Sequence, residues 1–295
     1  MNSNHSLSRS YIICFAAYFF AVLVAGLALL AMKKSGYGGN VLAETFVADI
    51  AATLAIFLFS VIFRNSSLYD AYWSVVPPFI AYGWWRIFPG DNLVGTLFLV
   101  AILFWAVRLT YNWMRGWTGL GHEDWRYKML HDKNPSMYWL TNLGGIHLFP
   151  TVMVFLGLLP VYYAFYQPQE LNLWLLYVGF AVAVIATIIE MVADEQMRSF
   201  KRTAKPNEFI KTGLWRYSRH PNYFGEISFW FGLWVMMMAV APNYWWSAIG
   251  FVAMTIMFLF ASIPMMEEKN KKNKKGFEEY TNKVSVLIPL PSKLD

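Results

Sequence analysis

The stretch from Leu214 to Glu226, LWRYSRHPNYFGE, concentrates side chains that can bind and polarise a ligand. Pro221 fixes its own φ angle and favours the first turn of a helix, so we expect Asn222 and the residues after it to open a helix. The free N–H groups of that turn carry partial positive charge. With Arg219 and His220 just before it, this amino end predicts a place that can hold a phosphate.

Helical spacing places further polar groups of this stretch on one face. Asn222 and Glu226 are four residues apart, and Tyr223 and Glu226 are three apart. An asparagine amide can donate and accept hydrogen bonds, and an ionisable group in the first turns of a membrane span is functional by default. An interfacial ion pair between Arg219 and Glu226 is the alternative interpretation.

A second constellation ends the sixth apolar run. Glu190, Asp194 and Arg198 recur every four residues, so they lie on one stripe of a helix that continues to Lys201 and Arg202. A salt-bridged helix end explains Asp194 and Arg198 adequately. It explains Glu190 poorly, because Glu190 follows the apolar run AVIATII and is expected to be buried.

Two further polar groups lie earlier in the chain. Arg108, Asn112 and Arg115 recur at helical spacing just before GWTGLGHEDWRY, where they either extend to lipid headgroups or bind a polyphosphate. Asp70 opens the third apolar run, beside aromatic residues and two prolines. Its alternative role is to cap that helix, since aspartate is a good N-cap residue.

The histidines and the cysteine do not predict a metal site. The single cysteine excludes an intrachain disulfide and a cysteine-based metal centre. Glu267, Glu268 and His220 could meet in space, although nothing in the sequence requires it. There is no G-x-G-x-x-G after a strand, so any nucleotide must be bound by helix ends and loops. Four of the five histidines lie within or after the apolar runs, scattered and without a pair at ligand spacing: His122, His131, His147 and His220.

The composition indicates the elements that must position these groups. Of the 295 residues, 57% are hydrophobic and only 14% are charged, which predicts an all-α, polytopic membrane protein. Aromatic residues make up 19%, and they favour either membrane interfaces or pockets for flat apolar ligands. The net charge is +6, but the basic residues follow membrane spans, which argues against a nucleic-acid partner.

A window of roughly 20 apolar residues per span predicts about eight transmembrane helices, or seven if the short third run is re-entrant. That third run is interrupted by Pro77-Pro78. The fifth contains Pro150 and Pro160, so a kink is expected. The runs are Tyr11–Met32, Phe46–Phe63, Trp73–Phe88, Leu93–Trp113, Met137–Tyr166, Leu171–Ala193, Tyr223–Val240 and Trp245–Pro264.

Basic residues gather in three connections: between runs four and five, between six and seven, and after the last. The connections Gln167–Glu170 and Ala241–Asn243 carry no lysine or arginine. The positive-inside rule therefore places the three basic segments in the cytoplasm, together with the amino terminus. Lys33 and Lys34 then lie outside, against the rule.

Several of these segments resemble the steroid 5-alpha-reductase family. The motif LWRYSRHPNYFGE, a following helical hairpin, PMMEEKN and GFEEYTNKVSVLIPLP are similar to its bacterial branch, formerly described as a domain of unknown function. So are ADEQMRSFKR, NSSLYDAYWSVVP and GLGHEDWRY. The broader group is the superfamily of the 3-oxo-5-alpha-steroid 4-dehydrogenase C-terminal domain. The resemblance covers Ser67 to the end, which suggests N-terminal transmembrane helices over 1–66 and a reductase-like domain over 67–295.

The resemblance implies a helical fold that opens to the cytoplasm, with NADPH bound by loops and helix ends of residues 190–295. Asn222 and Glu226 would contact the nicotinamide end, beside Tyr223. Asp194, four residues after Glu190, would lie along the cofactor. The remaining cofactor-binding residues that the resemblance implies are Lys201, the phosphate or ribose neighbours Tyr217, Arg219 and His220, and Arg115 in YNWMRG.

The resemblance also implies a catalytic pair, a carboxylate early in one span and a tyrosine late in the next. Asp70 is the candidate for the first and Tyr111 for the second, with Tyr82 as a rival. The nicotinamide would deliver hydride to the β-carbon of an enone-like C=C bond. Tyr111 or protonated Asp70 would stabilise the carbonyl oxygen, because a carboxyl group in an apolar site has a raised pKa and can donate near neutral pH.

The sequence thus predicts an NADPH-dependent oxidoreductase of lipid metabolism, an integral protein of the bacterial inner membrane whose cofactor site faces the cytoplasm. Its partners are a lipophilic small-molecule substrate and membrane lipids. The alternative is an S-adenosylmethionine-dependent methyltransferase resembling the isoprenylcysteine carboxyl methyltransferases. NADPH is favoured because three phosphates need more cations than a sulfonium does. A transporter is a third hypothesis, without visible inverted repeats. The substrate and the oligomeric state stay open.

Overall fold

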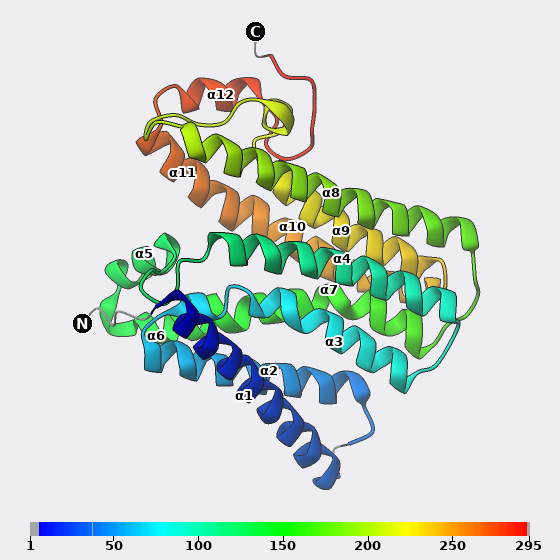
Figure 1. Ribbon diagram of the computed structural model, residues 1–295. Coiled ribbons are helices and arrows are strands. Elements are labelled where there is room, and N and C mark those ends of the chain that lie inside the picture. Colours follow the sequence, from blue (N-terminus) through cyan, green and yellow to red (C-terminus); the bar gives the residue numbers. More distant parts are fainter. Residues whose placement is uncertain (1–5, 37, 294–295) are drawn as a thin grey trace. The chain divides into compact units, whose positions relative to one another are not determined.

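The computed structural model describes residues 6–36 and 38–293, and these form helices joined by short connections, with no strand (Figure 1). The α-helices are α1 (Leu7–Lys34), α2 (Val41–Phe63), α3 (Tyr72–Ile87), α4 (Asn92–Gly116), α5 (Trp125–Lys133), α6 (Tyr138–Thr141), α7 (Phe149–Tyr166), α8 (Leu173–Thr203), α9 (Pro221–Met238), α10 (Ile249–Met257), α11 (Ile263–Asn273) and α12 (Phe277–Lys283). Short 3-10 turns are η1 (Ser66–Leu68), η2 (Pro135–Met137), η4 (Gly213–Arg216) and η5 (Pro242–Ala248), and π-turns are η3 (Asn142–Leu148) and η6 (Phe258–Ser262).

Six helical stretches of the described chain are long and apolar enough to cross a membrane: α1, α2, α4, residues 135–166, α8 and residues 242–273. The predicted all-α class is confirmed. The six apolar stretches are compatible with an integral membrane protein. The two other predicted spans correspond to α3, which has 16 residues, and α9, which begins with polar residues. The count of eight stays a prediction.

The prediction that two prolines interrupt the third apolar run is wrong. The prolines Pro77 and Pro78 do not interrupt the third run, because α3 continues through both of them. Proline removes one backbone hydrogen bond, but its fixed φ angle is itself helical, so a pair can remain within a helix that neighbouring residues support.

The chain folds into two compact units, each built from two segments. The first comprises the described residues up to 83 together with 109–155, and the second comprises 84–108 together with 156 onward. The division into 1–66 and 67–295 that the sequence suggests stays a prediction.

In the first unit, α1 and α2 pack along small side chains. Cys14, Ala17 and Ala21 of α1 share a buried cluster with Ala52 and Ala55 of α2. Small residues let membrane helices approach closely, so that backbone and side-chain contacts replace the hydrophobic driving force that lipid does not supply. The Tyr18 hydroxyl also donates to the Leu68 carbonyl oxygen at 2.9 Å, which ties α1 to the turn before α3.

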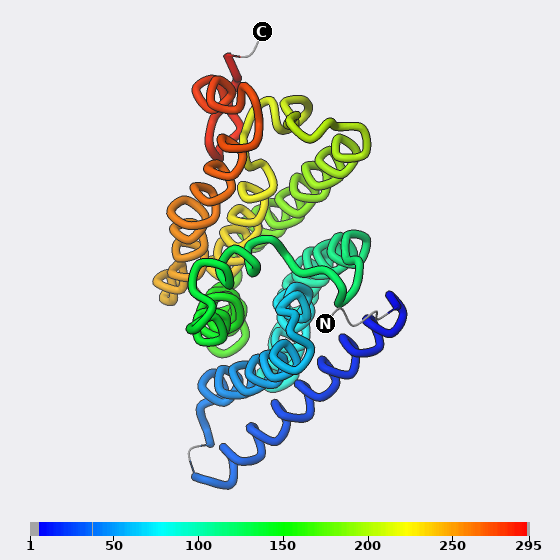
Figure 2. Tube along the Cα trace, turned by 90° about the vertical axis from the view of Figure 1, so that its left-hand side faces the viewer, coloured from blue at the N-terminus to red at the C-terminus, as the bar shows by residue number. Residues whose placement is uncertain are grey.

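In the second unit, α8 and α9 lie side by side (Figures 1 and 2) and approach through glycines. A Cβ on Gly179 of α8 would lie 2.6 Å from the Met236 backbone nitrogen. A Cβ on Gly232 of α9 would lie 2.7 Å from the Ala183 backbone nitrogen. Neither position has space for a side chain, so these glycines set the distance between the two helices.

The long stretch over residues 135–166 is irregular at a different place from the one expected. The π-turn η3 occupies Asn142–Leu148, just before Pro150. A π-turn contains one residue more than a regular helix would over the same length, and it is a known cause of bends. The His147 side chain uses the altered backbone, since its Nδ1 lies 3.3 Å from the Asn142 carbonyl oxygen.

The C-terminal segment fixes the loop that precedes α9. The Arg219 backbone N–H donates to the Ser285 carbonyl oxygen at 2.9 Å, and the Ser218 hydroxyl donates to the Leu287 carbonyl oxygen at 2.7 Å. The Tyr280 hydroxyl donates to the Trp215 carbonyl oxygen at 2.5 Å. As predicted, α9 then begins at Pro221.

Candidate functional site

A cluster of buried charges lies in the second unit, where α4 meets α8. Arg108 of α4 reaches two carboxylates of α8: its Nη2 donates to Glu190 Oε2 at 2.5 Å and its Nη1 donates to Asp194 Oδ2 at 3.0 Å. Glu190 is 2% exposed and Arg108 is 7% exposed. The two carboxylates are one helical turn apart, so a single guanidinium can hold both. The predicted burial of Glu190 is confirmed.

Glu226 of α9 completes the cluster with two tryptophans. Trp105 Nε1 donates to Glu226 Oε2 at 3.0 Å, and Trp230 Nε1 donates to Glu226 Oε1 at 2.8 Å. Each carboxylate oxygen therefore has an indole donor, which offsets the cost of removing it from water. The Glu226 carboxyl also interacts with that of Glu190 across the interface of α8 and α9.

Gly225 makes this proximity possible. A Cβ on Gly225 would lie 2.4 Å from Glu190 Cγ and 2.8 Å from the Ala186 carbonyl oxygen. Only glycine therefore lets α9 bring Glu226 against Glu190. The motif NYFGE thus contains a packing residue as well as a polar one.

The cluster has more carboxyl groups than Arg108 contacts. Arg108 contacts two of the three carboxyl groups, and Arg198 attracts Asp194 from one turn further along α8. The cluster is consequently rich in hydrogen-bond acceptors. Asn222, one turn before Glu226, adds another, because its Oδ1 is buried without a hydrogen-bond partner among the described residues. The arrangement can receive a ligand that brings N–H donors or positive charge.

Two predicted phosphate neighbours are occupied by contacts within the protein. Arg219 Nε forms an ion pair with Glu267 Oε1 at 2.8 Å, and His220 Nε2 lies 3.1 Å from the same oxygen. Arg219 also donates to the Thr281 carbonyl oxygen. The alternative ion pair between Arg219 and Glu226 is therefore wrong, and Glu267 takes that place.

The remaining cofactor candidates of the second unit lie around the start of α9. The Tyr223 ring stacks on the His220 ring, with centroids 5.3 Å apart, and on Phe258 at 4.4 Å. Tyr217 is 46% exposed and Lys201 is exposed at the end of α8. The structure thus brings Glu190, Asp194 and Glu226 together, whereas it leaves these basic and aromatic groups at the periphery of the described site.

Three candidates belong to the first unit. Tyr111 is 57% exposed, and the Arg115 guanidinium lies over its ring, 4.7 Å from the centroid. Asp70 accepts a hydrogen bond from the Tyr127 hydroxyl at 2.5 Å. Burial raises the pKa of Asp70 to about 7, although the Tyr127 hydrogen bond opposes the shift. No hydrogen bond joins Asp70 to Tyr111 in the part of the chain that the structure describes. The rival Tyr82 is 51% exposed.

Sequence reasoning missed the two tryptophans and placed Arg108 elsewhere, at headgroups or a polyphosphate. A local signal was present, since Trp105 and Arg108 are three residues apart and Glu226 and Trp230 are four apart. Such pairs share a helix face. With 14 tryptophans in the chain, the spacing alone could not separate these two from interfacial ones.

The fold and this cluster define a helical, membrane-type protein with a buried ionic site. The chain belongs to the family described as a protein of unknown function (DUF1295), which matches residues 56–284. An uncharacterized protein of the fission yeast Schizosaccharomyces pombe is 25% identical over 255 residues, covering 77% of this chain and 73% of the relative. No solved structure matches the chain.

Proposed function

We propose that this protein is a membrane-embedded, NADPH-dependent reductase of a conjugated C=C bond in a lipophilic substrate. The proposal is supported mainly by Asn222 Oδ1, which is buried without a hydrogen-bond partner among the described residues, one helical turn from Glu226. The amide N–H of a nicotinamide carboxamide is the donor that this oxygen needs. Amide-to-amide pairing would then orient the ring beside the acidic cluster.

NADPH would supply the hydride for the reaction. The protein's part is electrostatic: Glu190, Asp194 and Glu226 form an acidic surrounding that favours positive charge. A nicotinamide ring becomes positively charged when it gives up hydride, so carboxylates near it stabilise the oxidised form. The two indole donors and Arg108 hold these carboxylates in place.

The phosphates of the cofactor would be bound by exposed basic side chains of the second unit. They lie at the end of α8 and in the loop before α9, where they are free to turn toward an anion. Arg219 is excluded from this set, because Glu267 and backbone carbonyl oxygens hold it. The set comprises Lys201, Arg202, Lys205 and Lys211.

On the substrate side, we assign the proton-donating role to Asp70, with Tyr111 as the second candidate. With its pKa raised to about 7, the Asp70 carboxyl keeps a proton at neutral pH in a substantial fraction of molecules. It would donate a hydrogen bond to the oxygen on which charge develops. A lipophilic enone suits a protein with six membrane-type helices.

One observation favours a second candidate, the S-adenosylmethionine-dependent methyltransferase. A sulfonium is a small cation, and carboxylates surrounded by tryptophan rings suit a cation well. The acidic cluster with Trp105 and Trp230 fits that description. Against it, a sulfonium does not need the basic segment that follows α8.

The test is a thermal shift of the full chain in nonionic detergent, titrated with NADPH and with S-adenosylmethionine. A ligand that binds the folded state stabilises it by about 2.7 kcal/mol at 100 times its Kd. We expect Tm to rise with NADPH and not with S-adenosylmethionine. A rise with S-adenosylmethionine alone would favour the methyltransferase over the reductase. No rise with either ligand would contradict both proposed functions.

Two variants test the site itself. Asn222→Ala and Glu226→Gln should abolish the NADPH shift while leaving a cooperative melting transition. Asn92→Ala, at the exposed start of α4, is the matched control and should respond like the wild type. Unchanged NADPH titrations for both site variants would show that α9 does not bind the cofactor. Turnover is then measured with lipophilic enones of different ring systems.

A further inference from the structure

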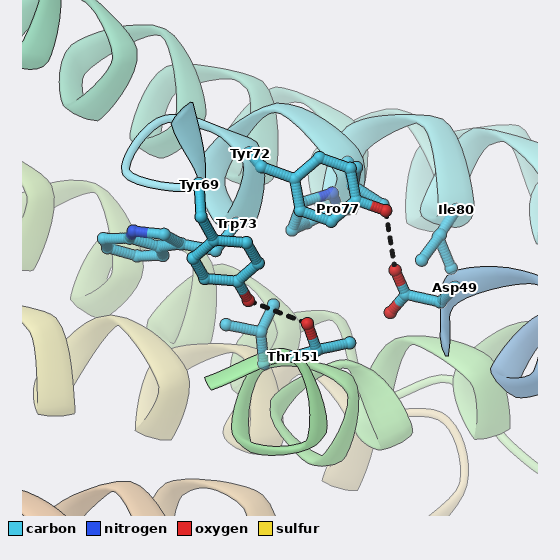
Figure 3. Close-up of a pocket in the computed structure, with 9 residues that line it drawn as sticks. Asp49, Tyr69, Tyr72, Trp73, Pro77, Ile80 and Thr151 are labelled. Atoms are coloured by element: carbon cyan, nitrogen blue, oxygen red, sulfur yellow. Dashed lines mark hydrogen bonds between the residues drawn. The ribbon is translucent and has the colours of Figure 1, made fainter. Parts of the chain in front are cut away.

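A second buried polar site lies within the first unit, and none of the residues proposed to bind the cofactor lines it. Asp49 of α2, Tyr69 before α3, Tyr72 and Trp73 of α3, and Thr151 of α7 line a small pocket (Figure 3). Its volume is about 10 Å³, close to the space that one water-sized group requires. The pocket therefore admits a single small polar group.

Asp49 is a carboxylate in a segment that otherwise suits a membrane. It lies eight residues into α2, which corresponds to about 12 Å along the helix, and it is 8% exposed. Its Oδ1 accepts from the Tyr72 hydroxyl at 3.3 Å (Figure 3). Its Oδ2 has no hydrogen-bond partner among the described residues. An ionisable group at this depth marks a functional site by default, because it is costly to bury.

The hydroxyl donors of the pocket are used within the protein. The Thr151 hydroxyl donates to the His147 carbonyl oxygen at 2.9 Å, so the Tyr69 hydroxyl, 2.7 Å from Thr151 Oγ1, donates to Thr151. The Tyr72 hydroxyl donates to Asp49. A ligand that only accepts, such as a ketone or an ether, would leave Asp49 Oδ2 without a donor. The occupant must itself donate hydrogen bonds.

The lining also selects for positive charge. The rings of Tyr69 and Tyr72 lie 5.6 Å apart, and Trp73 adds a third aromatic side chain to the lining of the pocket. Electron-rich ring faces and a carboxylate without a cation attract a cation together. A water-sized donor with positive charge is a primary ammonium group, whereas a trimethylammonium group is too large and has no N–H.

We propose that this pocket binds the primary ammonium group of a lipophilic amine, whose apolar chain extends from the pocket toward the surrounding hydrocarbon. Phe79 of α3 is 72% exposed, as expected for a surface that contacts hydrocarbon chains. The ammonium group would donate to Asp49 Oδ2. The site is separate from the proposed cofactor site and does not depend on it.

The test uses native mass spectrometry of the full chain in nonionic detergent, with three probes of equal chain length. Dodecylamine, charged at pH 7, should form a saturable one-to-one adduct. Dodecanol, which lacks the charge, and dodecyltrimethylammonium, which lacks the donors, should bind at least ~tenfold more weakly. Equal binding of all three would overturn the proposal, because it would report contact of the chain alone.

Asp49→Asn should weaken dodecylamine binding at least ~tenfold, since it removes the charge and keeps the shape. Asp132→Asn, at a side chain 65% exposed, is the matched control and should bind like the wild type. Two results would mean that the pocket holds only a bound water. One is that Asp49→Asn binds dodecylamine with wild-type affinity, and the other is that no adduct forms at any concentration of dodecylamine.

A wild-type experiment keeps the proposal testable if the Asp49 variant does not fold. Dicyclohexylcarbodiimide modifies carboxyl groups in apolar surroundings, and peptide mapping locates the modified residue. Dodecylamine should protect Asp49 from modification, whereas dodecanol should not. Equal modification with and without the amine would contradict the proposal. NADPH thermal shifts recorded in parallel report separately on the cofactor site.

Discussion

The carboxylate of Glu226 is held by two indole N–H groups, one on each oxygen. Trp230→Phe removes one donor and keeps most of the ring packing. A buried acceptor that loses its partner costs about 1–3 kcal/mol, so we expect the variant to unfold at lower temperature. Calorimetry of the purified protein measures the change. Trp174→Phe, at a side chain 78% exposed, is the control and should leave Tm within error.

Asp70 predicts a dependence of stability on pH. Its folded-state pKa is raised to about 7, above an unfolded value near 4. The folded state therefore prefers the protonated form, so the stabilisation is complete below about pH 4 and is lost as the pH rises through about 7. Asp70→Asn should remove this contribution. The Tm of the variant minus that of the wild type should grow between pH 5 and pH 7 and stay constant above pH 7. A difference that does not change with pH would contradict a raised pKa of Asp70.

Single residues could be predicted where they broke a pattern. Glu190 is conspicuous because it follows the largely apolar run AVIATII, and the structure buries it as expected. Trp105 and Trp230 break no pattern in a chain that is 19% aromatic, so their role could only be found from distances. Arg219 was likewise assigned to a neighbour in sequence, whereas its partner Glu267 is 48 residues away.

At the scale of elements, the pair formed by α8 and α9 determines the cofactor site. Gly232→Ala would place a methyl group 2.7 Å from the Ala183 backbone nitrogen, so the helices must separate. Overpacking of this kind costs about 1–3 kcal/mol. We expect a lower Tm and a weaker NADPH shift, because Glu226 moves with α9. Gly26→Ala, which has open space in α1, is the control; equal Tm values for the two variants would show that the interface has room.

Helices were predictable within a few residues because apolar runs of this length have few alternative structures. The sixth apolar run ends at Ala193 by hydropathy, but the four-residue spacing of Glu190, Asp194 and Arg198 predicted that its helix continues to Lys201 and Arg202. The structure confirms this, because α8 ends at Thr203. The interruption predicted at Pro77-Pro78 was wrong, because proline is a local signal and packing against neighbouring residues overrides it.

For the whole molecule, the charge distribution predicts which connections face the cytoplasm. To measure the side of the membrane that each connection faces, single cysteines are introduced into a Cys14→Ser background. Intact cells are then labelled with a membrane-impermeant maleimide. A cysteine at Gln169 should react from outside, and one at Lys205 should react only after permeabilisation, because basic loops remain inside. Labelling of both from the same side would contradict the predicted topology.

The pairing of distant segments could not be derived from one sequence. Helical spacing relates residues three or four apart, whereas the contacts that assemble the site join α4 to α8 and α9, across about 80 to 120 residues. Apolar faces that suit lipid also suit another helix, so hydropathy alone does not say which helices become neighbours. The motifs resembled a branch formerly described as a domain of unknown function, and the chain belongs to DUF1295 over residues 56–284, whereas the relation to steroid reductases stays a proposal.

The π-turn over Asn142–Leu148 has a consequence for sequence length. Deleting a residue from a regular helix rotates everything beyond it by about 100°. Deleting Gly145 would instead return this turn to the regular repeat, so Thr151 would still face Thr53, its partner at 2.9 Å. The turn η3 can thus absorb a one-residue gap that the regular helix α7 after it could not, and alignments of relatives should place such a gap here.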